Sequence, residues 1–132
     1  MRYAITITGA PYTSQAPQTA FRFCEALLAR GHEIHSLFLY GDGVYLASHL
    51  QTPPRDEVNW YRRWTELLSQ ANVPAIVCVA SALRRGLVDE REARRHELEA
   101  FNVRAPWQIA GLGTWIEART EADRALQFGP GN

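Results

Sequence analysis

The stretch Ala75-Ile76-Val77-Cys78-Val79, followed at once by Ala80-Ser81-Ala82-Leu83-Arg84-Arg85-Gly86, decides the fold of this chain. Its first part is a short apolar run, which is typical of a buried strand. Its second part indicates a helical turn. A strand that passes directly into a helix points to an α/β architecture, and it places the thiol of Cys78 at the junction.

The same alternation of strand-like and helix-like segments extends along the chain in both directions. Turn-forming residues at 9–14, Gly31, Gly41-Asp42-Gly43 and Pro53-Pro54 separate the segments. The predicted strands are residues 3–8, 33–40, 75–79, 107–110 and 125–128. The predicted helices are residues 15–30, 58–70, 89–100 and 114–123, with a short helical turn at 44–50.

Strands that alternate with helices predict a mostly parallel sheet covered on both faces. We therefore expect a single-domain, three-layer, flavodoxin-like α/β fold with about five strands in the order 2-1-3-4-5. No repeat or linker divides the chain, so residues 1–128 are predicted to form one domain. The tail at residues 129–132 is predicted to be flexible.

Cys78 is the candidate catalytic residue. In the expected strand order, it lies beside the loop of residues 9–14, at the switch point where ligands of α/β sheets gather. Helix N-termini and nearby cations, here Arg84 and Arg85, favour the thiolate form of a cysteine. The opposing interpretation is that a cysteine in a Val-rich strand is buried and inert. A solvated position is favoured for at least one of the two arginines.

Composition excludes several classes of function. Of the 132 residues, 46% are hydrophobic and 21% charged, which is ordinary for a soluble domain. Because 14 basic residues balance 14 acidic ones, no charge excess favours nucleic acid or an anionic membrane. We find no signal-peptide pattern and no apolar run of membrane-spanning length, so we expect a cytoplasmic protein with reduced cysteines.

Other candidate sites are weaker. The four histidines lack metal-ligand spacing, and no serine-hydrolase motif occurs. Cys24 shares a helix face with apolar residues and is predicted to lie in the core. Trp60 and Trp64 lie one helical turn apart, and Tyr61 is expected to be exposed beside them if they are buried. This group of aromatic residues hints at a partner surface, as does the helix after Gly113.

The segment from Cys78 to Glu90, Cys-Val-Ala-Ser-Ala-Leu-Arg-Arg-Gly-Leu-Val-Asp-Glu, resembles the cysteine segment of the DsrE/TusD family of sulfur-transfer subunits. Gly31-His32-Glu33-Ile34, residues 38–44 and the carboxyl end from Gly111-Leu112-Gly113 through Phe128 are also similar to that family. The similarity covers nearly the whole chain. Ser81 stands where alanine is expected in many relatives, a change that should not disturb the thiol.

The resemblance implies a single α/β domain acting as a sulfurtransferase, in which Cys78 carries sulfur as a persulfide. It implies the reactive-cysteine subunit of a hetero-hexamer with two related subunits, similar to TusB and TusC or to DsrH and DsrF. It also implies a TusA-like sulfur donor and a TusE/DsrC-like acceptor. It implies no cofactor, and the chemistry needs no metal.

We expect this transfer to serve the sulfur relay for 2-thiolation of the tRNA wobble uridine. The alternative is the same transfer in dissimilatory sulfur oxidation, with the chain as the DsrE subunit of a DsrEFH complex. An alternative of another class is a non-catalytic assembly subunit with an inert Cys78. A flavodoxin-like small-molecule binder is weaker, because no phosphate-binding loop is visible.

Overall fold

The computed structural model describes residues 1–130, and its centre is one sheet of five parallel strands. In spatial order these strands are β4 (Trp107–Ala110), β3 (Ala75–Cys78), β2 (Glu33–Leu39), β1 (Arg2–Ile7) and β5 (Arg124–Phe128). Each predicted strand therefore exists, and the α/β fold class is confirmed.

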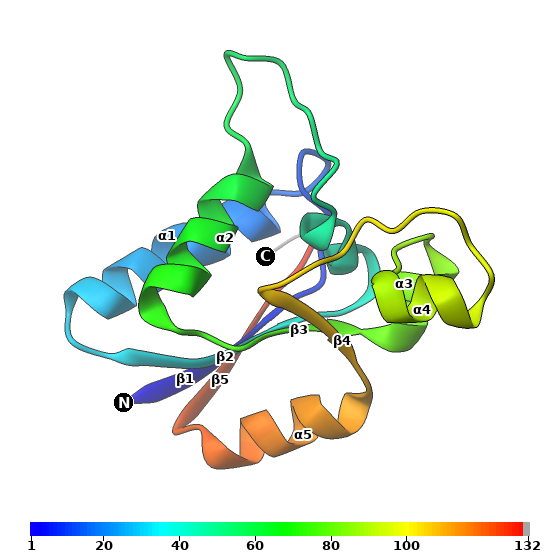
Figure 1. Ribbon diagram of the computed structural model, residues 1–132. Coiled ribbons are helices and arrows are strands. Elements are labelled where there is room, and N and C mark those ends of the chain that lie inside the picture. Colours follow the sequence, from blue (N-terminus) through cyan, green and yellow to red (C-terminus); the bar gives the residue numbers. More distant parts are fainter. Residues whose placement is uncertain (131–132) are drawn as a thin grey trace.

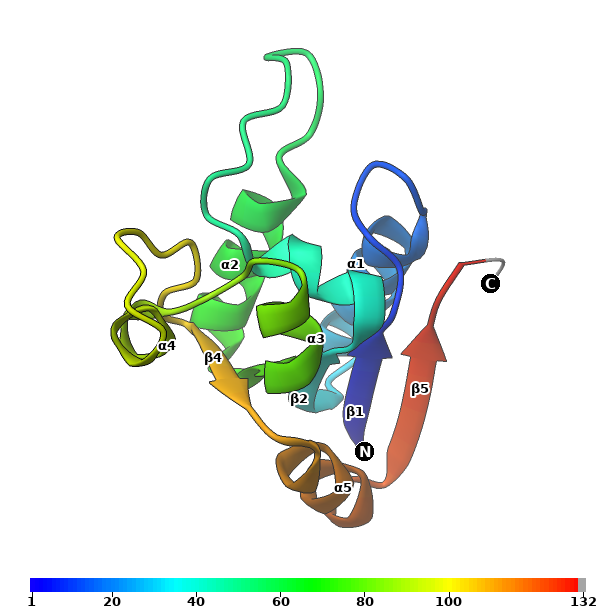
Figure 2. The same cartoon turned by 90° about the vertical axis from the view of Figure 1, so that its right-hand side faces the viewer.

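Helices cover both faces of the sheet (Figure 1). One face carries α1 (Ala16–Ala29) and α2 (Trp60–Ala71), and the opposite face carries α5 (Leu112–Glu121). The short helices α3 (Val79–Arg84) and α4 (Glu90–Arg95) follow β3 along the chain and lie on the side of the molecule that faces the viewer in Figure 2. The 3₁₀ helix η1 (Gly41–Ala47) follows β2 and contacts α3.

The predicted strand order, 2-1-3-4-5, is wrong. The chain steps in one direction from β1 through β2 and β3 to β4, and α5 then crosses the opposite face to bring β5 beside β1. Periodicity identifies strands but does not say which strands are neighbours, and both orders satisfy right-handed crossovers. The reversal therefore lies between β1 and β5, and β2 separates Cys78 from β1 and its loop.

The buried residues form a large cluster and a small one on opposite faces of the sheet. Ala75 and Val77 belong to the large cluster, which also holds residues of α1 and α2. Ile76 and Cys78 alternate with them and form the small cluster with Phe38. Because successive strand residues point to opposite faces, Cys78 faces α5.

The aromatic residues of α2 pack inside the domain. Trp64 is fully buried, and its indole nitrogen donates a hydrogen bond to the carbonyl of Pro17 across 3.0 Å. Tyr61 is half-buried and stacks on Trp107, with ring centroids 6.2 Å apart. The predicted exposure of Tyr61 is therefore wrong, because its ring packs against Trp107 of β4.

Two further predictions concern the membrane and the carboxyl end. Within residues 1–130, no helix has the length and apolar character needed to cross a membrane. Of the predicted flexible tail, residues 131–132 lie outside the described residues.

Candidate functional site

Cys78 lies at the junction predicted from the sequence. It is the last residue of β3 and the N-cap residue of α3, with φ of −57° and ψ of 122°. All four residues of β3 are buried, so the strand fixes the backbone of Cys78 from the core side. The apolar run that forms the strand thus also positions the thiol.

The side chain of Cys78 is almost fully enclosed, with a relative exposure of 2%. It belongs to the cluster with Phe38 and Ile76, against which Ala110 and Trp115 pack. Ala110 is also the residue paired with Cys78 in the ladder between β3 and β4. The thiol therefore lies under the amino-terminal half of α5, and another molecule could reach it only after some covering group moves.

Trp115 is the principal covering group that α5 supplies. Its indole nitrogen donates to the hydroxyl of Thr6 across 2.9 Å, and its ring lies 5.9 Å from that of Phe38. The guanidinium of Arg119 lies 4.7 Å from the centroid of the Trp115 ring. No residue of α5 is buried, so the helix covers this face of the sheet with few enclosed contacts.

A cavity of about 280 Å³ adjoins Trp115 on the same face of the sheet. Its walls are mostly uncharged hydroxyl and aromatic groups. It is lined by Thr6, Thr8, Tyr40, Leu112, Trp115 and Gln127. Because Trp115 forms one wall, its ring has free space on one side.

The two arginines after Cys78 have different roles. Arg84 is exposed, as the solvated interpretation predicts for at least one of them. Arg85 is partly buried, and its Nε lies 2.9 Å from Oδ1 of Asp42. A second guanidinium nitrogen of Arg85 donates to the backbone carbonyl of Ser81 across 3.1 Å. Arg85 therefore ties α3 to η1.

Ser81 and Gly43 complete the support of α3, and sequence reasoning missed both roles. The hydroxyl of buried Ser81 accepts a hydrogen bond from the backbone N–H of Gly41 across 3.0 Å. A Cβ atom at Gly43 would overlap the carbonyl group of Ile7. The glycine thus lets η1 lie directly on the carboxyl end of β1. The Gly-Asp-Gly pattern marks a turn but does not reveal these partners.

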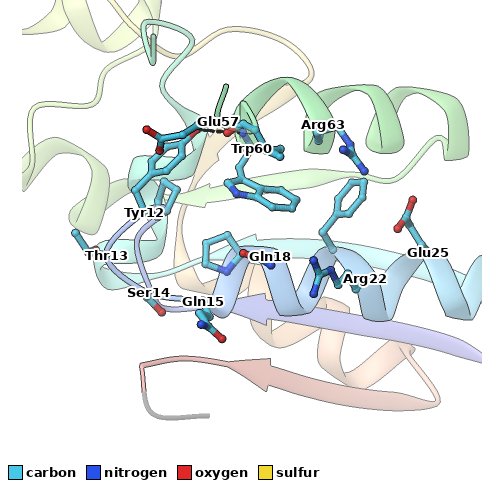
Figure 3. A pocket seen from close by; sticks show the side chains of 14 residues that line it. Tyr12, Thr13, Ser14, Gln15, Gln18, Arg22, Glu25, Glu57, Trp60 and Arg63 are labelled. Carbon is cyan, nitrogen blue, oxygen red and sulfur yellow. Dashed lines mark hydrogen bonds between the residues drawn. The ribbon is translucent and has the colours of Figure 1, made fainter. Parts of the chain in front are cut away.

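A larger cavity, of about 630 Å³, lies on the opposite side of the sheet between the amino-terminal ends of α1 and α2 (Figure 3). Trp60, Gln18, Arg22 and Arg63 line it, and Cys78 does not. The hydroxyl of Tyr12 donates to the carbonyl of Val58 across 2.8 Å and closes one end. The loop of residues 9–14 thus borders a cavity separate from the thiol.

Cys24 is confirmed as a core residue. It has no exposed surface on α1, and this burial raises the pKa of its thiol to about 12. A thiol with that pKa stays protonated near neutral pH. Cys78 is therefore the better placed of the two nucleophiles.

Comparison with known families identifies similarity over almost the entire chain. The model of the DsrE/DsrF-like family matches residues 1–128. A protein of Allochromatium vinosum named "Putative sulfurtransferase DsrE" is 44% identical over 129 residues, covering 98% of this chain and 99% of that protein.

A solved structure shares the same fold. The crystal structure of the ychN protein from E. coli matches with a TM-score of 0.77 and 24% identity, covering 97% of this chain and 99% of the other. At this identity the likeness supports the arrangement of helices and strands.

Proposed function

This chain belongs to the DsrE/DsrF-like family, and we propose that it is a sulfurtransferase subunit that carries sulfane sulfur as a persulfide on Cys78. The observation that carries the proposal is the position of Cys78 at the carboxyl end of β3, at the junction with α3. The relative named as a sulfurtransferase, 44% identical over the full chain, supports the same chemistry.

The transfer is an exchange between sulfur atoms. The Cys78 thiolate attacks the terminal sulfur of a donor persulfide, a new S–S bond forms to Cys78, and the donor S–S bond breaks. The donor cysteine leaves as a thiolate. The terminal sulfur moves to Cys78 together with its hydrogen. An acceptor thiolate then takes this sulfur by the same displacement. Because no net oxidation occurs, neither step needs an oxidant or a reductant.

The enclosed position of Cys78 suits a labile persulfide. A terminal sulfur held under Trp115 and beside Ala110 is shielded from small reductants except while the cover opens transiently. Direct transfer between proteins follows from this shielding. In the proposal the donor is TusA-like, the acceptor resembles TusE or DsrC, and two related subunits complete a cytoplasmic hetero-hexamer.

Two pathways remain for this chemistry. One is the relay for 2-thiolation of the tRNA wobble uridine, in which this subunit need not touch tRNA, since its net charge is zero. The other is dissimilatory sulfur oxidation. The name DsrE of the 44% identical relative favours sulfur oxidation.

A second candidate function is a non-catalytic assembly subunit. The observation that favours it is the 2% exposure of Cys78, which is typical of an inert core cysteine. In that case the family fold would serve only to contact related subunits. The two functions differ in whether sulfur ever bonds to Cys78.

Intact-protein mass spectrometry tests the proposal. The chain is incubated with inorganic polysulfide or with a persulfidated TusA-like donor, and excess reagent is removed. We expect added sulfur mass in the native protein and in the matched control Cys24→Ser, and none in Cys78→Ser. Equal sulfur mass in the Cys78→Ser variant, or none in the folded native protein, would place the chain among the assembly subunits.

A further inference from the structure

A groove on the connection between β3 and β4 exposes large apolar side chains. It encloses about 440 Å³, and its walls include Leu50, Val88, Glu97, Leu98, Glu99 and Phe101. Leu50 is 62% exposed, Leu98 51% and Phe101 40%. Clustered exposed residues of this size mark interaction sites more often than isolated ones do.

The floor of the groove is held in place by hydrogen bonds of Asn102. Its Oδ1 accepts from the backbone N–H of Val88 across 2.9 Å, and its Nδ2 donates to the carbonyl of Gly86 across 3.1 Å. Its own carbonyl accepts from the backbone N–H of His49 across 2.9 Å. Three separate segments thus meet at one residue, so the groove is formed before any partner arrives.

The charged groups that line the groove are both carboxylates, those of Glu97 and Glu99. Both residues are exposed, and within residues 1–130 neither forms an ion pair. Among the described residues, no arginine of α4 lines the groove; Arg94 contacts Glu90 and Arg95 contacts Glu92, while Arg91 is exposed elsewhere on the helix. The groove therefore combines an apolar floor with a negative rim.

We propose that this groove docks the acceptor protein through a segment that presents a large apolar side chain flanked by Arg or Lys. Positive flanking charges complement Glu97 and Glu99, and the apolar side chain covers Leu98 and Phe101. Delivery of sulfur to one acceptor protein requires recognition, which an exposed apolar groove with a negative rim can supply.

The groove lies close enough to Cys78 for this role. Cys78 caps α3, a helix of six residues and therefore about 9 Å long, and Gly86 at the other end of α3 borders the groove. Figure 2 shows α3 and α4 on the same side of the molecule. The edge of the groove at Gly86 is thus separated from Cys78 by about the length of α3. This inference rests on the proposed persulfide chemistry.

The test separates loading of sulfur from its delivery. Cys78 is loaded with inorganic polysulfide, excess reagent is removed, and loss of sulfur to the TusE/DsrC-like acceptor of the same organism is followed by mass spectrometry at limiting acceptor. The variant is Glu97→Arg with Glu99→Arg. The matched control is Glu25→Arg with Glu66→Arg, two exposed glutamates on α1 and α2 that undergo the same change of charge.

We expect normal loading in all proteins, but delivery slowed about tenfold or more in the groove variant only. The rate of delivery by the native protein should also be lower at high salt than at low salt, while the rate of the groove variant should not depend on salt. Normal delivery by a folded groove variant would overturn the docking inference and leave the persulfide chemistry intact. If the groove variant changes its oligomeric state in light scattering but delivers sulfur normally, the groove contacts a second copy of this chain. That result would also overturn the docking inference. Absence of loading in the native protein would instead refute the proposed function.

Discussion

The indole nitrogen of Trp115 donates a hydrogen bond to the hydroxyl of Thr6 across 2.9 Å, and this bond holds the ring against the cluster that contains Cys78. The two residues are 109 positions apart in the sequence. The bond joins α5 to the first strand and so fixes the cover of the sheet face that holds Cys78. Access to Cys78 and the position of Trp115 are therefore linked.

Replacing Trp115 by alanine should expose the thiol. We expect the rate of alkylation of Cys78 by iodoacetamide to rise at least about tenfold, because losing about 1.4 kcal/mol of covering contacts raises an open population by that factor. Peptide mass spectrometry of the folded protein measures the rate. Trp60→Ala, which removes a half-buried indole from the other face of the sheet, is the control and should leave the rate unchanged. Equal rates in the native protein and Trp115→Ala would show that Trp115 does not govern access.

Cys24 should not react with iodoacetamide in the same experiment. Burial raises the pKa of its thiol to about 12, so the folded protein holds it protonated at pH 8. Above its ordinary pKa of 9.0, the unfolded chain ionises Cys24 and the folded chain does not, so its contribution to stability falls as the pH rises from about 9 to 12. The Cys24→Ala variant should therefore show a smaller loss of stability over this range in urea titrations. An identical pH dependence in both proteins would contradict the assignment.

Gly43 should tolerate no side chain. A Cβ atom at this position would overlap the carbonyl group of Ile7, a backbone atom that cannot rotate away. We expect Gly43→Ala to lower the free energy of unfolding by about 1–3 kcal/mol, measured by urea denaturation. The control is Gly113→Ala in α5, where nothing lies within 4 Å of the added carbon. That variant should be neutral, or stabilised by less than about 1 kcal/mol. A fully stable Gly43→Ala variant would mean that η1 can shift away from β1.

Local patterns in the sequence predict the elements well but not their neighbours. The predicted strand 107–110 matches β4, and the predicted helix 15–30 matches α1 within one residue at each end. The predicted helix 89–100 is shorter, since α4 ends at Arg95. Strand order failed because it depends on which edge a returning strand takes, and residue periodicity carries no such information.

The candidate site was predictable only in part. The apolar run before Cys78 locates the thiol at the end of a strand, and the structure confirms this position. The cover by Trp115 was not predictable, because α5 has little amphipathic pattern and its partner Thr6 lies in the first strand. The contacts of Ser81 and Asp42 were likewise not predictable, because they depend on the position of η1 beside α3.

Ser81 supports the fold around the site rather than the chemistry. Its buried hydroxyl is the partner of the Gly41 N–H, at 3.0 Å, so Ser81→Ala leaves that donor unpaired. We expect the free energy of unfolding to fall by about 1–2 kcal/mol in urea denaturation. The control Ser69→Ala removes an exposed hydroxyl from α2 and should have little effect. Loading of Cys78 with polysulfide should remain complete in both variants, because the hydroxyl acts through the backbone of η1. A folded Ser81→Ala variant that no longer takes up sulfur would show instead that the hydroxyl takes part in the transfer.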